Sequence, residues 1–133
     1  MGAWGADAFD NDTAGDWVAE LEESSDLSVV ADAIQCVVEI GDDSLESDVA
    51  CEAVAACEVL ARLKGNAGKS DAYTEAVDEW VRTHPIKPPP ELVSAAITAI
   101  DRILGADSEL AELWEDDADW QSSMASLRKR VAN

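Results

Sequence analysis

Carboxylate side chains near the two ends of the chain are the residues best suited to do chemistry. One group follows the opening glycines and comprises Asp10, Asn11, Asp12 and Asp16, and the other is the run Asp116, Asp117 and Asp119. Carboxylate and amide oxygens are ligands that Ca²⁺ and Mg²⁺ take in proteins. Either group could therefore serve a cation-binding module or a carboxylate-based enzyme that depends on a divalent cation.

The first group also imitates the start of a calcium-binding loop. In the letters DNDTAG, Asp10 and Asp12 occupy the first and third ligand positions and Gly15 the sixth. Ala14 stands at the fifth position and Leu21 at the twelfth, where a bidentate glutamate belongs. Because the loop would lack these oxygens, we favour capping of a helix by the first group. For the second group we favour a solvated helix face.

Motifs for covalent or phosphate chemistry are incomplete. The only histidine, His84, lies at the end of a predicted helix, which favours a structural role over catalysis. Residues 65–70, GNAGKS, resemble a phosphate-binding loop, but Leu63 stands where the first glycine of that loop is required. The three cysteines lack paired spacing and are predicted to be free, buried thiols: Cys36, Cys51 and Cys57. The sequence thus predicts a non-catalytic protein without a cofactor or bound metal.

The charge balance restricts the partners of this chain. Acidic residues outnumber basic ones by 29 to 9, and the formal net charge is −20. Such a charge repels nucleic acid and anionic membranes, so neither is expected as a partner. The one cluster of bases, residues 128–130, falls in the last turn of a predicted helix and can offset its dipole. The acidity fits a surface solvated at high salt, or complementarity to a basic partner such as a toxin that this protein would neutralise.

Aromatic residues supply a second candidate for binding. The chain has five tryptophans, and all but Trp4 follow helical spacing, which predicts that most of them are core residues. Trp4 and Phe9 lie in a glycine-punctuated opening outside the predicted helices. Their rings could pack on the helices, or form with the neighbouring acids a recognition patch for Lys or Arg of a partner.

Helical periodicity governs the remaining sequence. Apolar residues recur at intervals of three and four almost to the end, in helices predicted to begin near residues 11, 27, 46, 71, 90 and 108. Short connections favour antiparallel neighbours. We predict an all-α fold, a compact antiparallel bundle of about six helices forming one domain over residues 1–133, with a non-helical arm at 1–10. Without a signal peptide or membrane-spanning run, the chain is expected in the cytoplasm.

Three details of this helical pattern are specific enough to check. Asp43 and Glu46 stand three apart and are predicted to form a variant of the capping box. Small residues on the third and fifth apolar stripes predict that these two helices pack closely at the centre. The last helix is predicted to bury Leu113 and Trp114, with a possible kink near residues 116–119.

The opening letters MGAWGADAFDNDTAGDW resemble those of a bacterial family known as domain of unknown function 4259. The shared positions are Gly2, Trp4, Gly5, Phe9, Asn11 and Asp12, and the stretch SELAELWED at 108–116 is similar too. The resemblance implies that the N-terminal arm belongs to the domain, and it implies no activity. The residues favour a non-catalytic protein-interaction module, with a cation-dependent enzyme or cation-binding module as the alternative.

Overall fold

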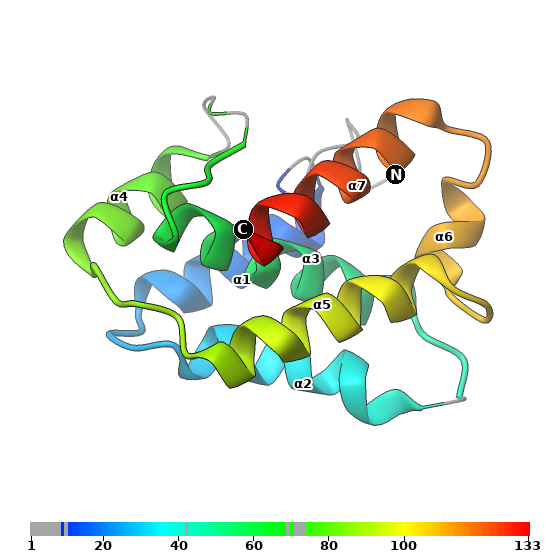
Figure 1. Cartoon of the computed structure of the whole chain (residues 1–133), viewed down its shortest axis with the longest axis horizontal. Helices are drawn as coiled ribbons and strands as arrows, with labels where there is room; N and C mark the ends of the chain where they lie inside the picture. The colour runs from blue at the N-terminus through cyan, green and yellow to red at the C-terminus, as the bar shows by residue number, and fades with distance from the viewer. Residues whose placement is uncertain (1–8, 10, 42, 69, 71–73) are drawn as a thin grey trace.

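Seven helices make up most of the part of the chain that the computed structural model describes, which is residues 9, 11–41, 43–68, 70 and 74–133. They are α1 (Asp12–Glu22), α2 (Ser28–Ile40), α3 (Ser47–Leu63), α4 (Glu75–Thr83), α5 (Pro90–Leu104), α6 (Glu109–Leu113) and α7 (Ala118–Ala132). The described residues contain no β-strand, and the helices pack into one compact body (Figure 1). The predicted all-α bundle of about six helices is therefore confirmed.

Helix α3 lies at the centre and packs against each of the other six helices. Every residue from Ala53 to Arg62 is buried, and all of them except Glu58 and Arg62 are apolar, as expected of a helix surrounded by others. Its alanines let neighbours approach closely, and the Cys57 thiol lies 3.9 Å from the Ala96 carbonyl oxygen of α5. Helices α3 and α5 are therefore in contact, as the small residues predict, but each of them packs more extensively on α2 than on the other.

The ends of the helices follow from local chemistry in most places. The side chain of Asn11 accepts a hydrogen bond from the Ala14 amide at 2.8 Å and caps α1. Gly41 ends α2 at a φ of 61°. The predicted capping box at Asp43 and Glu46 is wrong: Glu46 is the N-cap of α3 but makes no side-chain cap. The Ser47 amide instead donates to Glu109 Oε1 at 3.2 Å, so α6 supplies the cap from a distance.

The last predicted helix is divided into α6 and α7, which places a full break near the predicted kink. The turn closes through a hydrogen bond from the Asp117 amide to the Trp114 carbonyl at 2.9 Å, and Asp117 then caps α7. Because of this break, the apolar residues of α6 and α7 do not form one continuous stripe. Leu113, predicted to be buried, is 63% exposed, and Trp114 is half-buried.

Cysteine burial differs from the prediction in one position. Cys57 is buried and Cys51 half-buried, whereas Cys36 is exposed on α2. All three thiols are free, and burial raises the pKa of Cys51 to about 11 and that of Cys57 further.

None of the described helices is both long and apolar enough to cross a membrane.

A buried ionic network, absent from the sequence-based prediction, joins α3 to α7 and α4. Glu58 of α3 receives a bidentate bond from Arg130 of α7, with Nη1–Oε2 at 2.6 Å and Nη2–Oε1 at 3.0 Å. Arg62 lies one turn along α3, with its Nε 3.6 Å from Glu58 Oε2, and its Nη1 pairs with Asp78 of α4. Two acids and two bases thus balance in charge. In the same last turn Arg128 pairs with Asp101, so these two arginines are held by carboxylates rather than left to offset the helix dipole alone.

Candidate functional site

The N-terminal candidate residues have mainly structural positions where the structure describes them. Phe9 is 4% exposed and belongs to the core, and Asn11 is used to cap α1. Asp12 and Asp16 are exposed on α1. Trp4 and Asp10 lie outside the described residues, so the alternatives of packing and recognition stay open for Trp4.

The C-terminal candidates lie at a corner formed by α5, α6 and α7. Asp117 is the N-cap of α7, because its Oδ1 accepts a hydrogen bond from the Trp120 amide at 2.9 Å. Asp116 and Asp119 are exposed beside it. Helix α1 packs on α2, α3 and α4 but not on α6 or α7, so within the described chain the two acidic groups do not share a contact between helices.

The corner is held in place by contacts between distant parts of the chain. Leu45 and Ser108 form an isolated β-bridge through two hydrogen bonds, from the Leu45 amide to the Asp107 carbonyl at 2.8 Å and from the Glu109 amide to the Leu45 carbonyl at 2.9 Å. Arg102 of α5 donates to the carbonyls of Gly41, Asp43 and Ala106 at 2.9, 2.6 and 2.8 Å. These bonds fix the loop between α5 and α6, where Asp107 has a positive φ of 57°.

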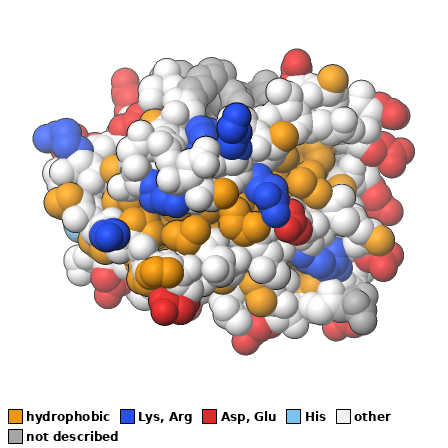
Figure 2. Space-filling model, in the orientation of Figure 1, with side chains coloured by type: hydrophobic (Ala, Val, Ile, Leu, Met, Phe, Trp, Pro, Cys, Tyr) orange, Lys and Arg blue, Asp and Glu red, His pale blue; other side chains and the backbone are white. Residues whose placement is uncertain are grey.

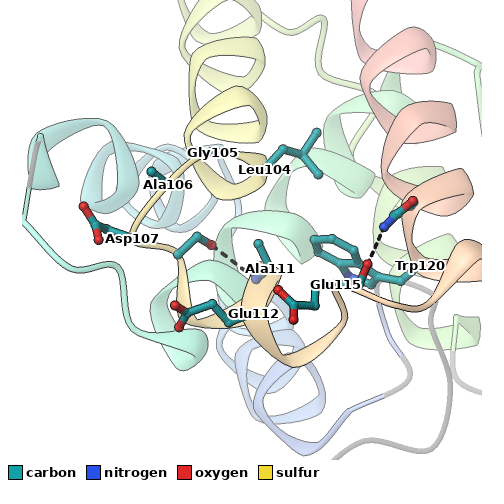
Figure 3. Close-up of a pocket in the computed structure, with 10 residues that line it drawn as sticks. Leu104, Gly105, Ala106, Asp107, Ala111, Glu112, Glu115 and Trp120 are labelled. Carbon is teal, nitrogen blue, oxygen red and sulfur yellow. Dashed lines mark hydrogen bonds between the residues drawn. The ribbon is translucent and has the colours of Figure 1, made fainter.

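Side-chain caps order the two short turns that complete the corner. Ser108 is buried, and its hydroxyl accepts from the Ala111 amide at 3.3 Å to start α6. Gln121 of α7 donates from Nε2 to the Glu115 carbonyl at 2.7 Å, which holds the turn after α6 against α7. Both bonds are visible in Figure 3. The walls of the corner are therefore preorganised.

An open cavity of about 430 Å³ lies inside this corner. Figure 3 shows Leu104 of α5, Ala111 of α6 and Trp120 of α7 around it, with the Glu115 side chain close to the Trp120 ring. It is lined by Leu104, Gly105, Ala106, Asp107, Ser108, Ala111, Glu112, Glu115, Trp120 and Gln121. We call this region, together with Leu113, the acidic corner.

The acidic corner combines apolar surface with carboxylates. Leu113 and Leu104 are the two exposed large hydrophobic residues among the described part of the chain, at 63% and 40%. Asp107, Glu112 and Glu115 are exposed on the lining, and the described lining residues include no Lys, Arg or His. An apolar wall beside these negative charges suits a ligand with an apolar body and a cationic head, such as a lysine or arginine side chain.

A second acidic surface lies between α1 and α3, where the pKa of Glu52 is raised by partial burial and by repulsion from Glu20 and Asp48. Asp48 also accepts a hydrogen bond from the Thr13 hydroxyl at 3.1 Å. Over the described part of the chain, no three potential metal-ligating side chains gather at one place. This surface therefore supplies a perturbed carboxyl but no evident coordination site.

His84 and the phosphate-loop lookalike both have structural positions. The His84 ring stacks on Trp80 at 4.6 Å between ring centroids, and its Nδ1 donates to the Trp80 carbonyl at 2.9 Å. In the lookalike, Gly65 has a φ of 84° and the Asn66 amide donates to the Ala61 carbonyl at 2.8 Å, which is the Schellman ending of a helix. A Cβ on Gly68 would come within 3.0 Å of the Arg130 guanidinium.

Sequence reasoning missed the residues that line the cavity of the acidic corner. It selected Asp116, Asp117 and Asp119, which adjoin lining residues in the chain but do not line the cavity in the structure. It assigned Leu113 to the core because it assumed one continuous helix. A signal was present in the alternating acids and apolar residues of ELAELWED, whose short helix leaves side chains of both kinds exposed.

Comparison with known proteins identifies one family. A family model described as "Domain of unknown function (DUF4259)" matches residues 2–125. The match includes the opening segment and the stretch at 108–116 that carry the resemblance noted in the sequence. No curated protein and no solved structure matches the chain.

Proposed function

We propose that this chain, which belongs to the family of domain of unknown function DUF4259, is a non-catalytic interaction module whose acidic corner binds a basic segment of a partner protein. The observation that carries the proposal is a cavity that has Trp120 and the exposed Leu104 in its wall and carboxylates among its lining residues. Helix α6, which contributes Glu112 to this lining, also exposes Leu113. Exposed apolar side chains are the usual centre of a protein contact, and the surrounding charge selects the partner.

The charge of the whole molecule supports the same partner. A net charge of −20 attracts a basic protein over about one Debye length, which is roughly 30 Å at 0.01 M salt, and raises its association rate. The corner then offers apolar contacts that operate only at short range. A small basic toxin or nuclease, neutralised by this protein, is the kind of partner such a combination serves.

Preorganisation favours binding over catalysis at this site. The carboxylates of the cavity lie in a corner fixed by backbone and side-chain bonds, so little entropy is lost when a partner docks. The described corner brings no histidine, cysteine or lysine to the carboxylates, so it offers no nucleophile and base in contact. The alternative of a cation-dependent module has no supporting cluster of ligands among the described residues.

Titration with two synthetic peptides tests the proposal. One is an amphipathic peptide of Lys and Leu, and the other has Glu in place of every Lys. The wild-type chain is expected to bind the basic peptide alone, and the affinity is expected to fall as NaCl rises from about 0.1 M to 1 M, where the Debye length shrinks from about 10 to 3 Å.

Variants locate the binding on the molecule. Replacing Glu112 and Glu115 by Gln together with Leu113→Ser is expected to weaken binding about tenfold or more, from lost charge and apolar contact. The matched control is Glu22→Gln with Glu39→Gln, which removes two exposed acids from α1 and α2. Equal weakening by both sets would mean that net charge alone attracts the peptide, and the proposed site would be wrong.

A further inference from the structure

A second cavity is lined by residues of opposite charge to those of the acidic corner. Figure 2 shows one face of the molecule, with a band of hydrophobic side chains, Lys and Arg along the band, and most Asp and Glu near the outline. Such segregation is unexpected in a chain with 29 acidic and 9 basic residues. Here the local charge opposes the charge of the whole molecule.

The cavity measures about 390 Å³ and lies between the end of α3 and the linker from α4 to α5. Leu63, Pro85, Ile86 and Pro88 supply its apolar surface. Among the described residues, Lys64 and Lys87 are the charged ones on the lining, and no carboxylate is among them. We call these six residues the lysine groove.

The linker side of the lysine groove is rigid. The Ile86 amide donates to the His84 carbonyl at 2.7 Å, and His84 is stacked on the buried Trp80. Pro88 is buried, and Pro89 has the extended φ and ψ of −65° and 146° that lead into α5. Because the ring of a proline fixes φ, the apolar wall does not need ordering when a ligand binds.

The two lysines differ in how they are held. Lys64 Nζ donates to the Val131 carbonyl at 2.6 Å, near the end of α7, which sets the position of its ammonium group. Lys87 is exposed and makes no ion pair with any residue in the described ranges. Both lysines line the cavity beside its apolar wall, so an anionic group bound there would lie close to a cation.

We propose that the lysine groove is a binding site for a small amphipathic monocarboxylate, with its alkyl body on Leu63 and Ile86 and its carboxylate between Lys64 and Lys87. The volume lies in the range of roughly 300–1,000 Å³ that ligand cavities have. The net charge of −20 favours a monoanion over an acidic peptide or phosphate-rich ligand, because each additional negative charge is repelled by the rest of the molecule.

Titration with octanoate tests the inference, with chemical shifts of backbone amides as the readout. Octanoate is expected to shift the amides of Ile86 and Lys87 in a saturable way. Its affinity should exceed that of hexanoate by up to about 15-fold, since each buried methylene contributes up to about fourfold. The heptyl trimethylammonium cation, which has the same heptyl tail and the opposite charge, is expected to bind at least tenfold more weakly.

Charge variants distinguish octanoate binding at the lysine groove from nonspecific binding elsewhere on the surface. Lys87→Glu is expected to weaken octanoate binding about five- to tenfold while leaving the fold intact, because Lys87 is exposed. Lys129→Glu is the matched control, since Lys129 is an exposed lysine outside the groove, and it should leave the affinity within twofold.

Four results would overturn the inference. Three of them are no saturable shift at the groove, equal binding of the anion and the cation, and equal effects of the two lysine variants. Tighter binding of an acidic Glu and Leu peptide than of octanoate would overturn it as well, and would make the groove a docking surface for protein. None of these results bears on the acidic corner, which lies on other elements.

Discussion

The arginines at the end of α7 offer a controlled measurement of what burial does to an ion pair. Arg130 and Arg128 are two residues apart in one helix, and each makes a two-bond contact with a carboxylate. The side chains of Arg130 and Glu58 are 18% and 8% exposed, whereas those of Arg128 and Asp101 are 45% and 54% exposed. Replacing each arginine by Met keeps the apolar stem and removes the charge.

The expected losses of unfolding free energy differ severalfold. Arg130→Met leaves Glu58 with Arg62 at 3.6 Å as its remaining cation and gives the four-residue network a net negative charge. Removing one partner of a buried pair costs roughly 3–5 kcal/mol, and the partial exposure of Arg130 puts the loss near the lower end, about 3 kcal/mol. Arg128→Met is expected to cost at most about 1 kcal/mol, because the exposed pair is screened by solvent.

Urea denaturation followed by tryptophan fluorescence and circular dichroism measures both losses. Adding Glu58→Gln to Arg130→Met removes the orphaned charge, so the double variant is expected to lose less than the sum of the single variants by about 1–3 kcal/mol. Equal losses for the Arg130 and Arg128 variants would refute the reasoning, and so would strict additivity in the double variant. Either result would mean that the balance of charges within the network does not contribute to the stability of the fold.

Three further predictions concern charge and backbone. Glu52 has a raised folded-state pKa, so its ionised form destabilises the fold above that pKa; Glu52→Gln is expected to raise the melting temperature at pH 7 and to lose this advantage as the pH falls below the ordinary carboxyl range. Gly65→Ala is expected to lower the stability by about 1–2 kcal/mol because φ is positive, while Gly15→Ala, inside α1 with nothing within 4 Å, should raise it by about 0.5–1 kcal/mol in the same urea assay. Raising NaCl from about 0.01 M to 1 M is expected to raise the melting temperature by screening the −20 charge. Ca²⁺ or Mg²⁺ at matched ionic strength is expected to give no further rise in the melting temperature measured by calorimetry. Extra protection by either ion would favour the cation-dependent alternative.

Local patterns were enough to predict most of the fold. The apolar stripes of α2, α3 and α5 have helical spacing, and Gly41, Gly65 and the proline at the start of α5 are residues whose backbone preferences end or begin helices. These signals work because they depend on neighbours within one turn. They predicted the order of the helices along the chain and the contact between α3 and α5.

Features that depend on distant partners escaped prediction. Glu58 and Arg62 have the spacing of a solvent-exposed pair, and only Arg130, which is 72 positions from Glu58, explains their burial. The acidic corner likewise depends on the bridge between Leu45 and Ser108, which no local sequence pattern predicts. Leu113 was assigned to the core because the stripe ignored the turn that Asp117 caps. Surface sites built where two chain segments meet need the tertiary structure.

The hydrogen bond from the Ser47 amide to the Glu109 carboxylate ties the first turn of the central helix α3 to α6. Glu109 belongs to the short helix at the acidic corner, yet it satisfies a backbone donor on the helix that touches all others. A cation that captured the Glu109 carboxylate would release that donor, and the first turn of α3 would fray. Hydrogen exchange at the Ser47 amide would then speed up when a cation binds the Glu109 carboxylate, so binding on α6 could be measured at the start of α3.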